Sequence, residues 1–242
     1  MRLALFGHGA MGRLVEARAR ADGHEIGLVL TSRDAARGAA ELAGELRGHD
    51  AAIDFSVADA VLRNVEACAR AGVTLVEGTT GWNEQADEAR RIVAAHGGSL
   101  VYGANFSVGV QIFYRVVRAA AEMLSAAGGY EPFIEEAHHS RKRDAPSGTA
   151  LNLRAIVEEA ARAESVSVAS TRAGHIPGTH RVGFDSAADQ ITLTHAARSR
   201  EGFVAGALLA ARRMAGRPGV LEFSELLDRL ISDRGGEDDG TS

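Results

Sequence analysis

The chain has 242 residues, of which 45% are hydrophobic and 24% are charged, and its formal net charge is −5 at neutral pH. This length suits one large or two modest domains, of which we expect two, and the acidic balance gives no sign of a nucleic-acid partner. No stretch approaches the ~20 apolar residues that a membrane span needs, and the single cysteine, Cys68, excludes an internal disulfide.

Strand-like and helical patterns alternate through the first hundred residues. Helices are predicted at 59–72 and 83–98, and each ends in glycine, as helices often do. This alternation is typical of an α/β fold with a doubly wound parallel sheet of the Rossmann type. The predicted strands are 2–6, 25–30, 51–56, 73–78 and 99–104.

A glycine-rich turn joins the first predicted strand to a helix. Its G-x-G-x-x-G spacing suits a dinucleotide: the first glycine permits a tight turn, the second lets backbone approach a pyrophosphate, and the third allows close helix packing. Amides at the helix start would then bind the phosphates. The alternative is a structural turn with incidental glycines. The predicted cofactor contacts in this turn are Gly7, His8, Gly9, Ala10, Met11 and Gly12.

The end of the second strand is expected to select between NADPH and NADH. An acidic residue there favours the ribose hydroxyls of NADH, whereas an arginine accommodates the 2′-phosphate of NADPH. The sequence offers Ser32 and Arg33, with no carboxylate before Asp34. We therefore favour NADPH and leave NADH open, since Arg33 is equally compatible with a solvated surface position.

Two further loops follow predicted strands and should face the same ligand crevice. In a doubly wound sheet, ligands bind outside the carboxyl ends of the strands. Small hydroxyl and amide groups at these ends suit a nicotinamide carboxamide, although each loop alone would be an ordinary turn. The predicted contacts are Gly78, Thr79 and Thr80 in one loop, and Gly103, Ala104, Asn105 and Phe106 in the other.

The remainder of the chain has the pattern of a second, α+β domain. A helix at 110–124 leads to a strand-like run at 130–138 and, after a turn, to a helix at 149–163. The runs at 180–186 and 189–197 suggest an antiparallel hairpin, with another β-like run at 165–171 before them. A further helix is predicted at 202–216, and the polar tail 234–242 is predicted to be disordered.

The turn between residues 138 and 150 concentrates cationic and proton-active groups. Ser147 is a candidate N-cap, so the amides of Gly148 and Thr149 would point toward an anion at the helix start. Lys142, just upstream, carries an ammonium that attracts a carboxylate or donates a proton. Individually, the neighbouring Arg141 and Arg143 are as compatible with a solvated surface as with a site.

Two adjacent histidines precede this turn. Neighbouring residues on a strand point to opposite faces, which makes His138 and His139 poor joint ligands for one metal, and no set of cysteines or carboxylates completes a site. We expect no metal, and a hydrogen-bonding or proton-transfer role for imidazole.

The motifs, taken together, resemble those of the dihydrodipicolinate reductase family, also called 4-hydroxy-tetrahydrodipicolinate reductase. They occur in family order over nearly the whole chain, and the motif EAHHSRKRDAPSGTA is highly specific. The resemblance implies NAD(P)H-dependent reduction of 4-hydroxy-tetrahydrodipicolinate (dihydrodipicolinate) to tetrahydrodipicolinate in lysine and diaminopimelate biosynthesis. The motifs are GHGAMG, AIDFS, EGTTG, ANFSVGV, EAHHSRKRDAPSGTA and ITLTHAARSR.

The same resemblance implies roles for residues and domains. Lys142 corresponds to the proton donor and His138 to the catalytic histidine, while the substrate-binding positions fall on His139, Gly148, Thr149 and Arg200. It implies a dinucleotide-binding domain at 1–106 and 201–242, and a substrate-binding and oligomerisation domain at 107–200. A cytoplasmic homotetramer that acts on a small cyclic dicarboxylate is expected. The segment between Ala163 and Arg172 is shorter than is usual in the family.

Two other function classes would use the same fold. Another two-domain nicotinamide enzyme, such as a semialdehyde dehydrogenase, would need a cysteine nucleophile on a loop, whereas Cys68 lies in a predicted helix. A nucleotide-sensing protein without catalysis would be expected to lose the proton donor first, and Lys142 is present.

Overall fold

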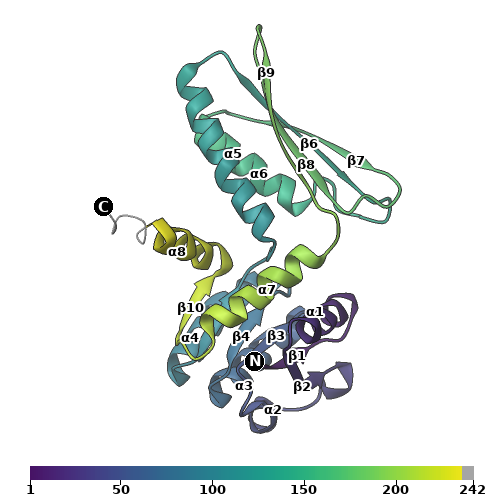
Figure 1. Ribbon diagram of the computed structural model, residues 1–242, viewed down its shortest axis with the longest axis vertical. Coiled ribbons are helices and arrows are strands. Elements are labelled where there is room, and N and C mark those ends of the chain that lie inside the picture. The colour runs from purple at the N-terminus through teal and green to yellow at the C-terminus, as the bar shows by residue number, and fades with distance from the viewer. Residues whose placement is uncertain (236–242) are drawn as a thin grey trace. The chain divides into compact units, whose positions relative to one another are not determined.

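The computed structural model describes residues 1–235 and divides them into two compact units (Figure 1). Residues 1–107 form the first unit together with the described chain from Phe203 onward, and Val108–Gly202 form the second. Within the described residues, no helix is both long enough and apolar enough to cross a membrane.

The first unit is built on a parallel sheet of six strands. Its order is β10-β5-β4-β3-β1-β2, and every recorded pairing is parallel, which confirms the predicted Rossmann-type fold. The sixth strand, β10, was not predicted, because its four residues lie between a glycine turn and a helix and carry little alternation. The strands are β1 Arg2–Phe6, β2 Glu25–Leu30, β3 Ala51–Asp54, β4 Thr74–Glu77, β5 Ser99–Tyr102 and β10 Gly219–Glu222.

Helices cover this sheet, and α2, α3 and α4 lie side by side (Figure 1). Helices α3 and α4 end at the left-handed glycines Gly72 and Gly97, as predicted. The final helix, α8, was not predicted, and the part of the tail beyond residue 235 lies outside the described residues. The helices are α1 Ala10–Ala21, α2 Ala39–Leu46, α3 Val61–Ala71, α4 Ala86–His96, α7 Glu201–Met214 and α8 Phe223–Gly235, with short 3-10 turns at Ser32–Asp34, Ala58–Ala60 and Asn83–Gln85.

The core of the first unit lies on both faces of the sheet. Strands β3 and β4 are buried along their whole length, as expected for central strands of a parallel sheet that is covered on both sides. Leu42 and Leu46 of α2 and Val65 of α3 pack against them. Cys68 is buried in α3, where burial, followed by the charge of Asp54, raises the pKa of its thiol well above the usual value. A buried helical thiol of this kind is no nucleophile, which counts against the semialdehyde dehydrogenase alternative.

The second unit places two helices on one face of a four-stranded mixed sheet. The order is β7-β6-β8-β9; β6 and β7 are parallel, and β8 and β9 form the predicted antiparallel hairpin. Val117 of α5, Leu153 and Val157 of α6, and Ile134 and Val182 of the sheet make its core. The elements are α5 Val108–Ala127, β6 Glu131–His138, α6 Gly148–Ala161, β7 Ser167–Arg172, β8 Thr179–Asp185 and β9 Gln190–Ala196.

Candidate active site

The glycine turn of the first unit has the form that a pyrophosphate requires. Gly7 has φ +85°, and a Cβ there would lie 2.7 Å from the carbonyl oxygen of Phe55; a Cβ on Gly12 would lie 2.1 Å from the Gly7 oxygen. By contrast, Gly9 caps α1 without a side-chain hydrogen bond, and no atom lies within 4 Å of the position its Cβ would take. Two glycines therefore fix the turn, and the third leaves open space at a helix N-terminus.

The other residues of this turn lie at the start of α1. Ala10 is exposed and Met11 half-buried, so the backbone of the first helical turn is accessible. His8 Nε2 lies 2.6 Å from Glu16 Oε2, a partner eight residues further along the chain that sequence reasoning did not identify. The residues present fit a dinucleotide at this turn.

At the end of β2, the Asp34 carboxylate is bound within its own loop. Asp34 accepts hydrogen bonds from the Thr31 amide at 2.8 Å and forms an ion pair with Arg37 at 3.1 Å. The Thr31 amide and the Arg37 guanidinium lower the pKa of Asp34, so the carboxylate stays ionised and bound. Ser32 and Arg33 are exposed, and the Arg33 amide donates to Thr31 Oγ1 at 3.3 Å.

The loops after β4 and β5 present fewer groups than the sequence predicts. Thr79 is buried: its amide donates to Glu77 Oε1 at 2.7 Å, and its hydroxyl lies 3.4 Å from Asp54 Oδ1. Thr80, in contrast, is exposed. Gly78 packs against the ring of Phe55, where a Cβ would lie 2.2 Å from a ring carbon.

Phe106 also belongs to the core rather than to an open surface. Its side chain is buried, and its ring centroid lies 4.6 Å from that of Phe223. Asn105 accepts a hydrogen bond from the Ser107 amide at 2.9 Å, and the Gly103 amide donates to the Glu77 carbonyl at 3.2 Å. Gly103 and Asn105 are half-buried and Ala104 is exposed, so the backbone of this loop, and not the Phe106 ring, is available to a ligand.

In the second unit, β6 ends in a buried pair of an acid and a histidine. His138 Nδ1 lies 2.5 Å from Glu136 Oε2, and both side chains are nearly fully buried. Arg172, the residue opposite His138 in the β6–β7 register, donates to both Glu136 oxygens, at 2.9 and 2.6 Å. Burial would raise the pKa of Glu136, but hydrogen bonds from Arg172, Ser170 and His138 outweigh it and hold this pKa at about 2.

A second buried histidine connects this pair to the start of α6. Ser147 caps the helix as predicted, since its hydroxyl accepts from the Ala150 amide at 3.2 Å. The same hydroxyl lies 3.1 Å from His180 Nε2, and the His180 and His138 ring centroids are 5.2 Å apart. The Ser147 amide donates to Glu136 Oε1 at 3.3 Å. Gly148 is exposed and Thr149 is half-buried at this helix start.

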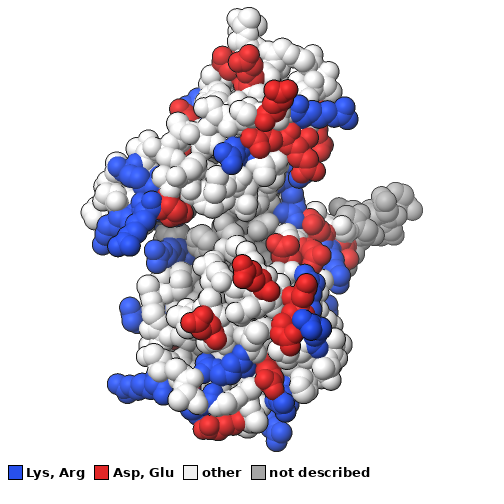
Figure 2. All heavy atoms as spheres, turned by 180° about the vertical axis from the view of Figure 1, so that it is seen from behind, with Lys and Arg blue, Asp and Glu red and all other residues white. Residues whose placement is uncertain are grey.

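Cationic side chains gather on the loop between β6 and α6. Lys142 Nζ lies 2.8 Å from Asp144 Oδ2, a partner that the sequence did not predict, and Lys142 is half-buried while Arg141 and Arg143 are exposed. Burial, and then the charges of Arg141 and Arg200, lower the pKa of His139, so its imidazole is neutral at neutral pH. Figure 2 shows acidic and basic residues interspersed over much of the surface, with a basic group at one edge of the unit that carries the second sheet.

Sequence reasoning did not identify three residues of this cluster: Glu136, Arg172 and His180. Residues i and i+2 of a strand share a face, so the spacing of Glu136 and His138 was a signal for the first. Arg172 and His180 reach the site only through the sheet register, which the sequence does not display.

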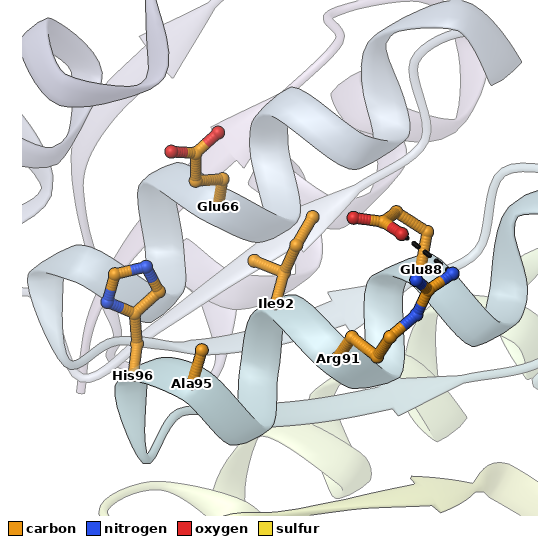
Figure 3. A pocket seen from close by; sticks show the side chains of 6 residues that line it. All are labelled: Glu66, Glu88, Arg91, Ile92, Ala95 and His96. Atoms are coloured by element: carbon orange, nitrogen blue, oxygen red, sulfur yellow. Dashed lines mark ion pairs between the residues drawn. The ribbon is translucent and has the colours of Figure 1, made fainter.

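A hollow of about 410 Å³ lies elsewhere, on α3 and α4 of the first unit (Figure 3). Glu88 and Arg91 form an ion pair of 2.8 Å at this hollow. None of the predicted site residues lines it, and its lining residues are Glu66, Glu88, Arg91, Ile92, Ala95 and His96. Across residues 1–235, no three His, Cys, Asp or Glu side chains are grouped so as to hold a metal ion.

A glycine turn of the form that a pyrophosphate requires, on an all-parallel sheet, with a separate unit that carries buried histidines beside a lysine, is typical of a two-domain oxidoreductase that uses a nicotinamide dinucleotide. The family model for the N-terminus of dihydrodipicolinate reductase matches residues 1–106, and that for its C-terminus matches residues 109–227. The chain belongs to the dihydrodipicolinate reductase family.

Individual relatives agree with this assignment. The chain is 32% identical to a 4-hydroxy-tetrahydrodipicolinate reductase of Christiangramia forsetii, over 96% of this chain and 99% of that protein. It is 34% identical to one of Archaeoglobus fulgidus, over 94% of this chain and 100% of that protein. The fold resembles that of dipicolinate-bound dihydrodipicolinate reductase from Paenisporosarcina sp. TG-14, with a TM-score of 0.78 and 19% identity over 92% of this chain and 97% of that one.

Proposed function

We propose that the chain reduces 4-hydroxy-tetrahydrodipicolinate to tetrahydrodipicolinate with NADPH or NADH, in the diaminopimelate route to lysine. The names of its relatives give this substrate, and the structure bound to dipicolinate is that of a protein with the same fold. The single observation that carries the proposal is the group of His138, Lys142 and the α6 N-terminus at one end of the second sheet.

Each group of this cluster has a role that follows from its surroundings. The α6 N-terminus at Gly148 and Thr149, with Arg200 and neutral His139, binds the carboxylates of the substrate. His138 polarises the substrate or relays a proton through its ring. Glu136 fixes the orientation of that ring by accepting a hydrogen bond from Nδ1. Lys142 donates the proton that neutralises the charge developing on the substrate.

The glycine turn, Thr80 and the loop at 103–105 hold the dinucleotide. When bound, the reduced nicotinamide supplies the hydride. Phosphates bind at the amides of Gly9, Ala10 and Met11, where α1 begins with open space.

We further propose that the chain prefers NADPH. Asp34 is already bound by Thr31 and Arg37, so it is not available to the ribose hydroxyls of NADH. The exposed Arg33 guanidinium and the Ser32 hydroxyl suit a 2′-phosphate at the same position.

Domain roles and assembly belong to the same proposal. Residues 1–106 and 201–242 form the dinucleotide-binding domain, and residues 107–200 form the substrate-binding and oligomerisation domain. The helices of the second unit pack on one face of its sheet, and the edge strand β9 is exposed along most of its length, which supports association of four cytoplasmic chains through this sheet.

The proposal is tested by a coupled assay in which dihydrodipicolinate synthase makes the unstable substrate in place from pyruvate and aspartate semialdehyde. Oxidation of NADPH, and separately of NADH, is followed by absorbance. Turnover that depends on the synthase supports the proposed reaction, and the ratio of the two rates decides the cofactor preference. Tight NADPH binding without turnover of either cofactor would contradict it.

A further inference from the structure

Two neighbouring strands of the first unit each end in a fully buried carboxylic acid. Asp54 is the last residue of β3 and Glu77 the last of β4, and the two are direct partners in the parallel register. Both have 0% of their surface exposed. Burial of two adjacent carboxylates is costly, so their protonation and partners determine what the pair does.

The surroundings of Asp54 are those of an anion. Its Oδ1 accepts from the Ser56 amide at 2.7 Å and lies 3.4 Å from the Thr79 hydroxyl, while its Oδ2 accepts from Asn64 Nδ2 at 2.7 Å. Three donors on two oxygens compensate the loss of water, as a buried carboxylate needs.

Glu77 has the surroundings of a carboxyl that keeps its proton. Its Oε1 accepts from the Thr79 amide at 2.7 Å, but no donor among the described residues reaches Oε2. An ionised oxygen left without a donor in the interior would be strongly disfavoured, whereas a protonated carboxyl needs an acceptor, and the Asp54 carboxylate on the neighbouring strand is in side-chain hydrogen-bond contact with Glu77.

Within residues 1–235, no recorded ion pair holds Glu77 ionised. Its other neighbours with titratable groups are Tyr102, opposite it on β5, and the Cys68 thiol on α3. Arg63 of α3 donates to Asn64 Oδ1, and Asn64 in turn binds Asp54. Burial, and next the charge of Asp54, raise the pKa of Glu77 well above its usual value.

We propose that Glu77 and Asp54 share one proton, and that this pair positions the loop 78–80 for the nicotinamide end of the cofactor; the second half rests on the proposed function. Thr79 bonds to both acids, through its amide and its hydroxyl, and its carbonyl accepts from Trp82 Nε1 at 2.9 Å. With Thr79 fixed inward, Thr80 is the residue that the loop presents to a ligand.

The segment after Asp54 also contacts the glycine turn. The Gly78 amide donates to the Asp54 carbonyl at 2.9 Å, and Gly78 packs on the Phe55 ring. The Phe55 carbonyl, in turn, approaches Gly7. Loop 78–80 and the glycine turn therefore both contact the segment that follows Asp54, but only loop 78–80 is bound directly to the Glu77 side chain, through the Thr79 amide.

A shared proton has a definite effect on stability. Glu77 retains its proton in the folded chain but loses it in the unfolded chain above about pH 4.3, so the folded state binds more protons there. Stability must then fall as the pH rises above that value. Glu77→Gln preserves a donor toward Asp54 and an acceptor for Thr79 without a proton to lose.

The shared proton is tested by infrared spectroscopy of the full chain at pH 8, where ordinary carboxyls are ionised. We expect the C=O stretch of a protonated carboxyl, which is absent in Glu77→Gln and retained in Glu84→Gln, a control at an exposed position. The stability gain of Glu77→Gln over the unmodified chain, from denaturant unfolding, should also grow between pH 5 and 9. No such band, or a gain that shrinks with pH, would overturn the shared proton.

The positioning role is tested by calorimetric affinities for NADPH and for 2′,5′-ADP, which lacks the nicotinamide end. Glu77→Ala should weaken NADPH binding about tenfold or more and leave 2′,5′-ADP binding nearly unchanged, while Glu77→Gln should preserve both. Equal weakening of the two ligands, or no weakening, would overturn this role. If the unmodified chain fails to bind NADPH, the positioning role fails with the proposed function, and the infrared result alone decides the shared proton.

Discussion

His138 Nδ1 lies 2.5 Å from Glu136 Oε2, and Arg172 binds both oxygens of that carboxylate from the neighbouring strand. The pKa of Glu136 is about 2, so its carboxylate is ionised at neutral pH. It therefore accepts the hydrogen bond that His138 Nδ1 donates. The second ring nitrogen, Nε2, then keeps its lone pair or takes a proton without losing the bond that orients the ring. The Gly178 backbone lies beside Nε2, where a Cβ would be 3.0 Å away.

Glu136→Gln should therefore lower kcat by about tenfold or more, because the imidazole loses the anion that fixes its tautomer and stabilises its protonated form. The pH dependence of kcat should shift as well. Glu135→Gln is the matched control, since Glu135 is on the same strand but exposed and paired with Arg181. Equal effects of the two variants would contradict a role for Glu136 in orienting His138.

Lys142→Ala should lower kcat by roughly 10²-fold or more, the usual scale for loss of a general acid, with NADPH affinity unchanged. The measurement is the coupled assay together with calorimetric NADPH binding. Arg143→Ala serves as control, because Arg143 is an exposed cation one residue away. Near-normal turnover of Lys142→Ala would exclude Lys142 as the proton donor.

The sequence predicted best those features that depend on local spacing. The glycine turn, the hairpin of β8 and β9, and the Ser147 cap follow from residues within a few positions of each other. The pairing of Glu136 with Arg172 spans 36 residues and depends on strand register, which a single sequence does not display. Thr79 shows another limit of prediction from sequence. A small hydroxyl after a strand suits a ligand, but the Thr79 amide and hydroxyl are hydrogen-bonded to the buried acids Glu77 and Asp54.

Arg33→Ala should raise the KM for NADPH by about tenfold and leave the KM for NADH nearly unchanged, since only NADPH carries the 2′-phosphate that the guanidinium would bind. Arg47→Ala removes an exposed arginine just after α2 and should alter neither value. A Arg33→Ala variant with an unchanged NADPH to NADH ratio would assign Arg33 to the solvated surface.

Ser147→Ala should destabilise the chain by about 1 kcal/mol or more, because α6 loses its N-cap and buried His180 loses the partner of its Nε2 atom. Ser147→Thr keeps the hydroxyl and should recover part of that loss. Free energies of unfolding from denaturant titrations at pH 7 check both. A fully stable Ser147→Ala chain would mean that neither hydrogen bond contributes to folding.

His180 should make the chain less stable as the pH falls from about 6.5 to 4. Burial, and then the charge of His138, lower the pKa of His180 to about 4, although Glu136 acts in the opposite direction; His195 and Lys142 also face the ring. Between these pH values the unfolded chain binds a proton that the folded chain does not, so stability rises with pH across this window. A shift of this size corresponds to at most roughly 3 kcal/mol. Glu136 loses its own contribution to stability only at lower pH, between about 4.3 and 2, which separates the two effects.

Denaturant unfolding at pH 7 and pH 5 should show a smaller loss of stability in His180→Asn than in the unmodified chain. His175→Asn, at an exposed position, should behave as the unmodified chain does. Identical losses in all three chains would mean that His180 takes up its proton in the folded state as readily as in the unfolded one.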